Sequence, residues 1–104
     1  PISIAPYDVA IIPMINKNDI SALEKANKIN FELEKNNIES IIDDTEENFS
    51  SKIKKMNLIG APYQIIIGKK TEGDLIEFKE VGKDSQKFKL KDIIKLISEQ
   101  KVKN

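Results

Sequence analysis

Three short segments of the chain are dominated by apolar, mostly β-branched residues. Residues 9–12 read Val-Ala-Ile-Ile and are closed by Pro13, and such an unbroken run is typical of a strand buried on both faces, as in a parallel sheet. Residues 38–42 predict a second strand. Residues 62–67, which end at Gly68, predict a third strand with the composition of a central one.

The segment between the first two strands repeats its apolar residues at helical spacing. Intervals of 4, 3 and 4 residues separate Ala22, Ala26, Ile29 and Leu33, and Leu23 widens this stripe. The pattern predicts an amphipathic helix of about four turns. Asn18-Asp19 offers a cap, and Ser21 and Glu24 have the spacing of a capping box. Asn36-Asn37 should end the helix, because Asn tolerates the left-handed conformation found at helix ends.

A second, shorter helix is predicted between the second and third strands. Its apolar positions are Phe49, Ile53 and Met56. Three lysines fall between them and should turn toward solvent or a partner: Lys52, Lys54 and Lys55. Gly60 should break this helix before the third strand.

After Gly73 the pattern changes to alternation. Ile76 and Phe78 alternate with charged residues, residues 82–84 read as a turn, and Phe88 with Leu90 repeats the alternation, which predicts an antiparallel hairpin. A last helix should point Leu90, Ile93, Ile94 and Ile97 inward. The expected fold is α/β, with a five-stranded mixed sheet, three flanking helices and the order β-α-β-α-β-β-α. We expect residues 1–104 to form one domain, excised from a longer protein because the chain opens on Pro.

Composition narrows the function classes. Lysine alone supplies the 17 basic residues, which balance 17 acidic ones, so any contact with nucleic acid should be local rather than driven by overall charge. The absence of cysteine and histidine excludes disulfides and thiolate metal sites and removes the commonest general base. No apolar run is long enough to cross a bilayer. We expect a domain without a catalytic or metal site.

An acidic loop and the lysines behind it are the main candidates for chemistry. Residues 43–47 read Asp-Asp-Thr-Glu-Glu at the end of a strand, where open α/β sheets place ligands. The carboxylates could hold a hard cation, accept from base edges or simply be solvated, and the lysines could pair with phosphates or form a solvent face. The glycines near residues 60–63 and 68–70 do not fit a phosphate loop and read as structural breaks.

Three phrases in order carry a family resemblance. They are IAPYDVAIIPM at residues 4–14, IIDDT at 41–45 and LIGAPYQIIIGKK at 58–70. Together they resemble the carboxy-terminal anticodon-binding domain of bacterial prolyl-tRNA synthetases over nearly the whole chain. Two departures stand out: Thr45 replaces an Arg that many members carry, and residues 49–53 replace a G-x-K-F phrase while keeping Lys52.

The resemblance implies that the domain grips the anticodon loop of proline tRNA, whose unstacked bases are accessible. Asp44, Thr45 and Glu46 would then face base edges, Lys52 would contact a base oxygen or a phosphate, and Lys54 with Lys55 would attract phosphates. It also implies a cytoplasmic parent enzyme, generally a homodimer, whose catalytic domain uses ATP and Mg²⁺ outside this segment, with no cofactor here.

Three other interpretations stay open. The chain could be the anticodon domain of a related threonyl-, histidyl- or glycyl-tRNA synthetase. It could be a protein-interaction module that kept the fold without binding RNA. A small carboxylate-dependent enzyme or metal protein is the third, although no convergent acid-base set is visible.

Overall fold

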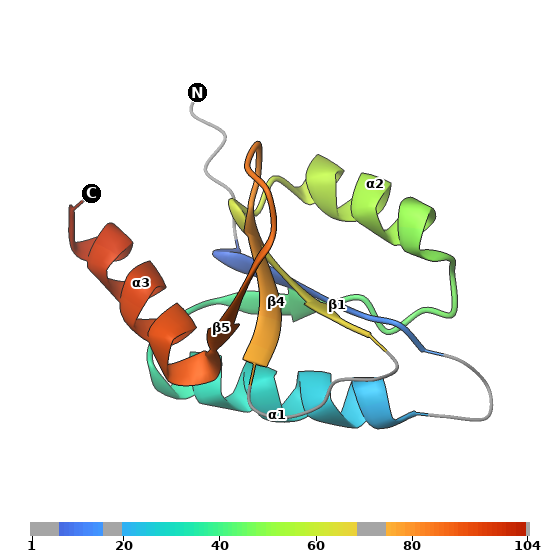
Figure 1. Cartoon of the computed structure of the whole chain (residues 1–104), viewed down its shortest axis with the longest axis horizontal. Coiled ribbons are helices and arrows are strands. Elements are labelled where there is room, and N and C mark those ends of the chain that lie inside the picture. The colour runs from blue at the N-terminus through green and yellow to red at the C-terminus, as the bar shows by residue number, and fades with distance from the viewer. Residues whose placement is uncertain (1–6, 16–19, 69–74, 104) are drawn as a thin grey trace.

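The structure is a computed structural model that describes residues 7–15, 20–68 and 75–103. Its elements in chain order are β1 (Val9–Pro13), α1 (Ser21–Lys35), β2 (Ser40–Ile42), α2 (Phe49–Ile59), β3 (Tyr63–Ile67), β4 (Leu75–Glu80), β5 (Gln86–Lys89) and α3 (Leu90–Lys103) (Figure 1). The predicted order is confirmed. The boundaries differ slightly, because β2 begins at residue 40 rather than 38. Leu90, which the sequence pattern assigned to both the hairpin and the last helix, is the first residue of α3.

One mixed sheet organises the molecule, with strand order β2-β1-β3-β4-β5. β1 runs parallel to both β2 and β3, whereas β4 runs antiparallel to β3 and β5. All residues of β1 and β3 are buried, which is why their sequences show no polar alternation. In β4, by contrast, Ile76 and Phe78 are buried and Glu77 between them is only half-buried, as predicted.

The helices cover the two faces of the sheet unequally. α1 and α3 lie on one face and α2 on the other (Figure 1). The larger core packs alternate residues of β1 and β3, such as Val9 and Ile65, against the apolar stripes of α1 and α3. The smaller core joins Ala10 and Ile12 to Met56 of α2. The only helix on its face is therefore α2, among the described residues, and it brings the lysines of its first turns to the carboxyl end of β1.

The observed ends of α1 agree in part with the caps predicted from the sequence. α1 ends at Lys35 with Asn36 as its C-cap, and Asn37 has a φ of 62°, so the predicted Asn stop is confirmed. The capping box at Ser21 is wrong, because Ile20 occupies the N-cap position and Ser21 is the first helical residue. The alternative cap at residues 18–19, like Gly73 and Lys69-Lys70, lies outside the described residues.

Sharper caps define α2. The Asn48 side chain accepts from the amide of Ser51 at 2.8 Å, which satisfies one of the free N–H groups at the helix start. At the other end Gly60 takes a φ of 84°, a left-handed conformation that glycine adopts without strain. The predicted break is confirmed, and the start of α2 is fixed directly behind the acidic loop. Across the three described ranges, no helix has the length and apolarity needed to cross a bilayer.

Candidate nucleic-acid interface

The acidic loop and the lysines of α2 meet at one edge of the sheet. β1 and β2 are parallel, so their carboxyl ends, at Pro13 and Ile42, lie at the same edge. The chain then passes through the loop into α2. We call residues 43–55 the rim. The structure brings together five of its side chains: Asp43, Thr45, Glu47, Lys52 and Lys55.

Lys52 lies beneath the rim rather than on it. Its side chain is 0% exposed, and its Nζ donates to the carbonyl oxygens of Pro13 at 2.7 Å and Asp43 at 3.2 Å. The prediction that Lys52 turns toward solvent is therefore wrong. The physical reason is its helical position, four residues before the buried Met56, which places its aliphatic stem on the packed face while its ammonium reaches backbone oxygens.

Two opposing effects act on the pKa of the buried Lys52 ammonium. Burial lowers the pKa of Lys52, and the negative charge of Asp43 opposes this without reversing it. Pro13 is the last residue of β1 and Asp43 directly follows the last residue of β2, so the ammonium ties the end of β1 to the start of the loop after β2. Lys52 is thus a fixed support for the loop that follows β2.

Asp43 is the second buried member of this cluster. It is 3% exposed, and its Oδ1 accepts from the amide of Thr45 at 3.1 Å and from the hydroxyl of Thr45 at 2.6 Å. Its Oδ2 lies 3.2 Å from Nζ of Lys55. Burial raises the pKa of Asp43, but the hydrogen bonds from Thr45 and Lys55 outweigh it and the net pKa is lowered. Asp43 is therefore an ionised carboxylate committed to the loop's own structure.

Lys55 connects the buried cluster to the exposed surface. It forms ion pairs with Asp43 and Glu47, and the hydrogen bond with Glu47 is the main cause that raises the pKa of Lys55. The same bond, followed by one from Thr45, lowers the pKa of Glu47. The Thr45 hydroxyl lies 3.0 Å from Glu47 as well as beside Asp43, and its single proton serves one carboxylate at a time.

The side chains that remain available to a ligand are few. Asp44, Glu46 and Lys54 are exposed, while Thr45 and Lys55 are half-buried. The adjacent aspartates thus divide their roles, since Asp43 points inward and Asp44 lies at the surface. The sequence-based hypothesis placed Asp44 and not Asp43 at base edges, but it did not foresee the structural roles of Asp43 and Glu47. The exposed set offers carboxylate acceptors beside a cation, which suits base edges next to phosphates.

Comparison with known proteins decides the family. The model of the anticodon binding domain family matches residues 8–100. The chain belongs to the anticodon-binding domain family. A proline–tRNA ligase of Pelagibacter ubique (strain HTCC1062) is 62% identical over 104 residues, which is 100% of this chain and 23% of that relative. The predicted resemblance to bacterial prolyl-tRNA synthetases is confirmed, and the chain spans about a quarter of this relative's length.

Solved structures carry the same fold. Prolyl-tRNA synthetase from Cryptosporidium parvum, complexed with L-proline and AMP, superposes with a TM-score of 0.77 at 20% identity, over 90% of this chain and 21% of its own. The RNA binding domain of threonyl-tRNA synthetase from Cryptosporidium parvum Iowa II gives 0.79 at 16% identity, over 90% and 23%. The mixed sheet with three helices is therefore the architecture of class II synthetase anticodon-binding domains.

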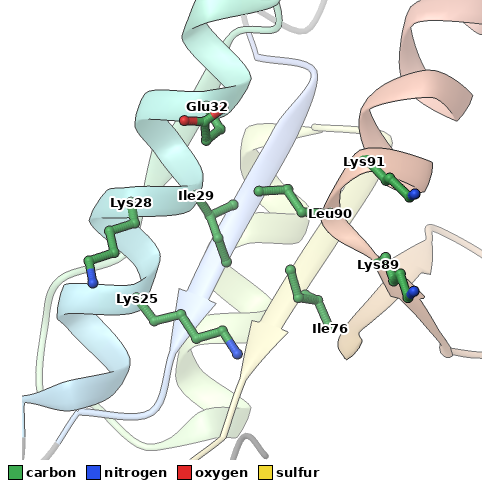
Figure 2. Close-up of a pocket in the computed structure, with 8 residues that line it drawn as sticks. All are labelled: Lys25, Lys28, Ile29, Glu32, Ile76, Lys89, Leu90 and Lys91. Carbon is green, nitrogen blue, oxygen red and sulfur yellow. The ribbon is translucent and has the colours of Figure 1, made fainter. Parts of the chain in front are cut away.

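A second basic surface lies on the other face of this anticodon-binding domain, and the sequence did not indicate it. A groove of about 510 Å³ runs between α1, β5 and the start of α3. Its floor is apolar, and its edges carry Lys25, Lys28, Lys89 and Lys91. Figure 2 shows Lys25 extending toward Ile76, whereas the ammonium groups of the other three point away from the groove. The groove therefore does not converge its cations on one ligand.

Proposed function

We propose that this anticodon-binding domain serves a proline–tRNA ligase and reads the anticodon loop of proline tRNA at the rim. The observation that carries the proposal is the division within residues 43–55: a buried, hydrogen-bonded base of Lys52 and Asp43 under an exposed set of Asp44, Glu46 and Lys54. A loop held this way presents its polar groups without having to become ordered on binding.

The roles at the rim follow from the chemistry of the exposed groups. Carboxylates of Asp44 and Glu46 accept from amino groups on base edges, and half-buried Thr45 can donate or accept. Lys54 supplies an ammonium group that can pair with a phosphate. Lys55 adds to the positive potential that attracts phosphates while it stays paired with Glu47. Lys52 acts from below as a support, because its ammonium already holds two backbone carbonyls.

The parent activity is part of the same proposal. The 62% identity to a proline–tRNA ligase across all 104 residues supports prolyl specificity. This domain would then work within a longer cytoplasmic chain, generally a homodimer, whose ATP- and Mg²⁺-dependent ligation of proline to tRNA occurs in another domain. The domain needs no cofactor and no membrane for reading RNA.

A panel of labelled anticodon stem-loops tests the proposal. Stem-loops of proline, threonine, histidine and glycine tRNAs are titrated into the 104-residue chain at low salt, and affinity is measured by fluorescence anisotropy. We expect the proline stem-loop to bind most tightly. A preference for another stem-loop would assign the domain to a different synthetase, and no salt-dependent binding to any of them would favour a protein-interaction module.

A further inference from the structure

One cation of the rim is paired with acidic side chains of the domain itself. Lys55 forms ion pairs with two carboxylates, Asp43 and Glu47. The Lys55 side chain is 40% exposed and that of Glu47 is 48% exposed, whereas Asp43 is almost completely buried. On the side that faces solvent, the partner of this cation is therefore Glu47.

The two carboxylates are held to different degrees. Asp43 accepts hydrogen bonds from the amide and the hydroxyl of Thr45, at 3.1 and 2.6 Å, and its other oxygen lies 3.2 Å from Nζ of Lys55. The Glu47 carboxylate is held by the Lys55 ammonium and by the Thr45 hydroxyl, whose single proton it shares with Asp43. Asp43 is thus the fixed counterion of Lys55, while the exposed side chain of Glu47 can rotate into solvent.

Both donors to Glu47 meet at the same oxygen atom. The ammonium of Lys55 and the hydroxyl of Thr45, which lies at 3.0 Å, each contact Oε2 of Glu47. This oxygen marks a position where an anionic oxygen meets a cation and a hydroxyl. Phosphate oxygens form the same charge-assisted hydrogen bonds as carboxylate oxygens, and these bonds are stronger than those to neutral acceptors. A phosphate can therefore compete with Glu47 for this position better than a base carbonyl can.

We propose that a backbone phosphate of the bound RNA takes the place of Glu47 on Lys55. This rests on the proposed function, which puts RNA at the rim. In the free domain Lys55 is paired with Glu47, and on docking the ammonium keeps Asp43 and changes only its exposed partner. Because one ion pair replaces another, Lys55 adds little net affinity. Glu47 acts as an internal competitor that weakens RNA binding at the rim.

Neutralising Glu47 tests this exchange. The proline stem-loop is titrated into the 104-residue chain and its Glu47→Gln variant, with fluorescence anisotropy measured at several salt concentrations. We expect the variant to bind about two- to five-fold more tightly at low salt, because an exposed ion pair no longer has to be broken. In the parent, the released Glu47 takes up a cation as the phosphate loses one. Without this uptake, the salt slope of the variant should steepen by about 1.

Two further variants separate the exchange from a general effect of charge. Glu46→Gln removes the same charge from the neighbouring exposed position, and it should weaken binding, because the proposed function has Glu46 accept from a base edge. A double-mutant cycle uses Lys55→Gln as its second change. Once the Lys55 ammonium is absent, Glu47→Gln should no longer tighten binding. Urea denaturation checks that Lys55→Gln folds.

Inorganic phosphate tests the position without RNA and without a change at Lys55. It is titrated into the parent and into Glu47→Gln at constant ionic strength, and the backbone amides of residues 45–47 and 55 are followed by NMR. We expect these amides to shift in both proteins, with half-saturation at a two- to five-fold lower phosphate concentration in the variant.

Equal affinities and equal salt slopes for the parent and Glu47→Gln would overturn the proposal. An equal gain from Glu46→Gln would also overturn it, since it would indicate a general effect of negative charge. Both outcomes leave the proposed function in place as long as the proline stem-loop is preferred. If no stem-loop binds, the proposed function fails, and equal phosphate half-saturation in the two proteins would then overturn the role of Glu47 separately.

Discussion

The residue with the most consequence for the rim is Lys52. Three neighbouring lysines of α2 look alike in sequence, yet Lys52 is buried, Lys55 is paired with two carboxylates and Lys54 is exposed. An aliphatic stem of four carbons allows a lysine to pack like an apolar residue while its ammonium reaches polar atoms. Whether a lysine at such a position faces inward depends on acceptors at its tip. Here those are the carbonyls of Pro13, at the end of β1, and of Asp43, directly after β2.

Replacing Lys52 tests this support. Lys52→Met retains the stem but leaves the carbonyls of Pro13 and Asp43 without their donor. We expect the free energy of unfolding to fall by about 1 to 3 kcal/mol, the usual cost of buried polar groups without a partner. Urea denaturation measures it. Lys54→Met, at an exposed position of the same helix, should change stability by less than about 0.5 kcal/mol, and equal effects of both variants would contradict the buried role.

Asp43 gives the rim a defined response to acid. Its folded-state pKa lies below the ordinary value of 3.8, so below that pH the unfolded chain binds its proton more readily than the folded chain does. The stabilisation is complete above 3.8 and is lost as the pH falls through the lowered folded value. Asp43→Asn should therefore cost about 1 to 3 kcal/mol at pH 6. The difference from the parent should shrink as the pH falls below 3.8.

Urea denaturation of both proteins across this pH range provides the check. Glu47→Gln serves as the comparison, because Glu47 accepts from Lys55 and Thr45 at the surface. A gap between Asp43→Asn and the parent that stays constant in acid would show that the carboxylate's charge contributes nothing.

At the scale of elements, the end of α2 depends on a backbone conformation. Gly60 has a φ of 84°, and a Cβ there would meet nothing within 4 Å. The cost of Gly60→Ala is thus conformational rather than steric, and we expect a loss of about 1 kcal/mol. Gly68→Ala is the matched control, since Gly68 has equally open space without a positive φ. Thermal denaturation of both variants measures the difference, and equal midpoints would argue against the left-handed cap.

The elements themselves were largely predictable because their signals are local. The unbroken apolar runs of β1 and β3 were enough to predict both strands. Gly60 and Asn36-Asn37 follow the ends of their helices as expected. The start of α1 was predicted wrongly, because residues with capping-box spacing can occur at several neighbouring positions of a sequence. The inward turn of Asp43 could not be read from sequence, since it depends on Lys55 lying twelve residues further along the chain and folded back over the loop.

For the whole molecule, charge balance limits how RNA can be bound. Equal numbers of basic and acidic residues give no net charge, so counterion release should come from the few lysines at the rim. We expect the logarithm of the stem-loop affinity to fall with the logarithm of salt concentration with a slope of only about −1 to −2. Lys54→Ala should reduce the magnitude of this slope by about 1.

Anisotropy titrations at several salt concentrations measure the slope. Lys95→Ala, an exposed lysine of α3 far along the chain from the rim, should leave it unchanged. Equal slopes for the parent and Lys54→Ala would remove Lys54 from the phosphate contacts, and a parent slope several times steeper would place RNA over a much wider lysine surface.

The short length of β2 has a consequence for the behaviour of the protein in concentrated solution. β2 is one edge strand of the sheet and has three residues. β5 is the other edge strand, has four residues and carries Lys87 and Lys89. Short edge strands offer little unpaired backbone to a strand of another molecule, and lysines on an edge strand discourage such pairing. The domain thereby avoids joining its own copies edge to edge into aggregates.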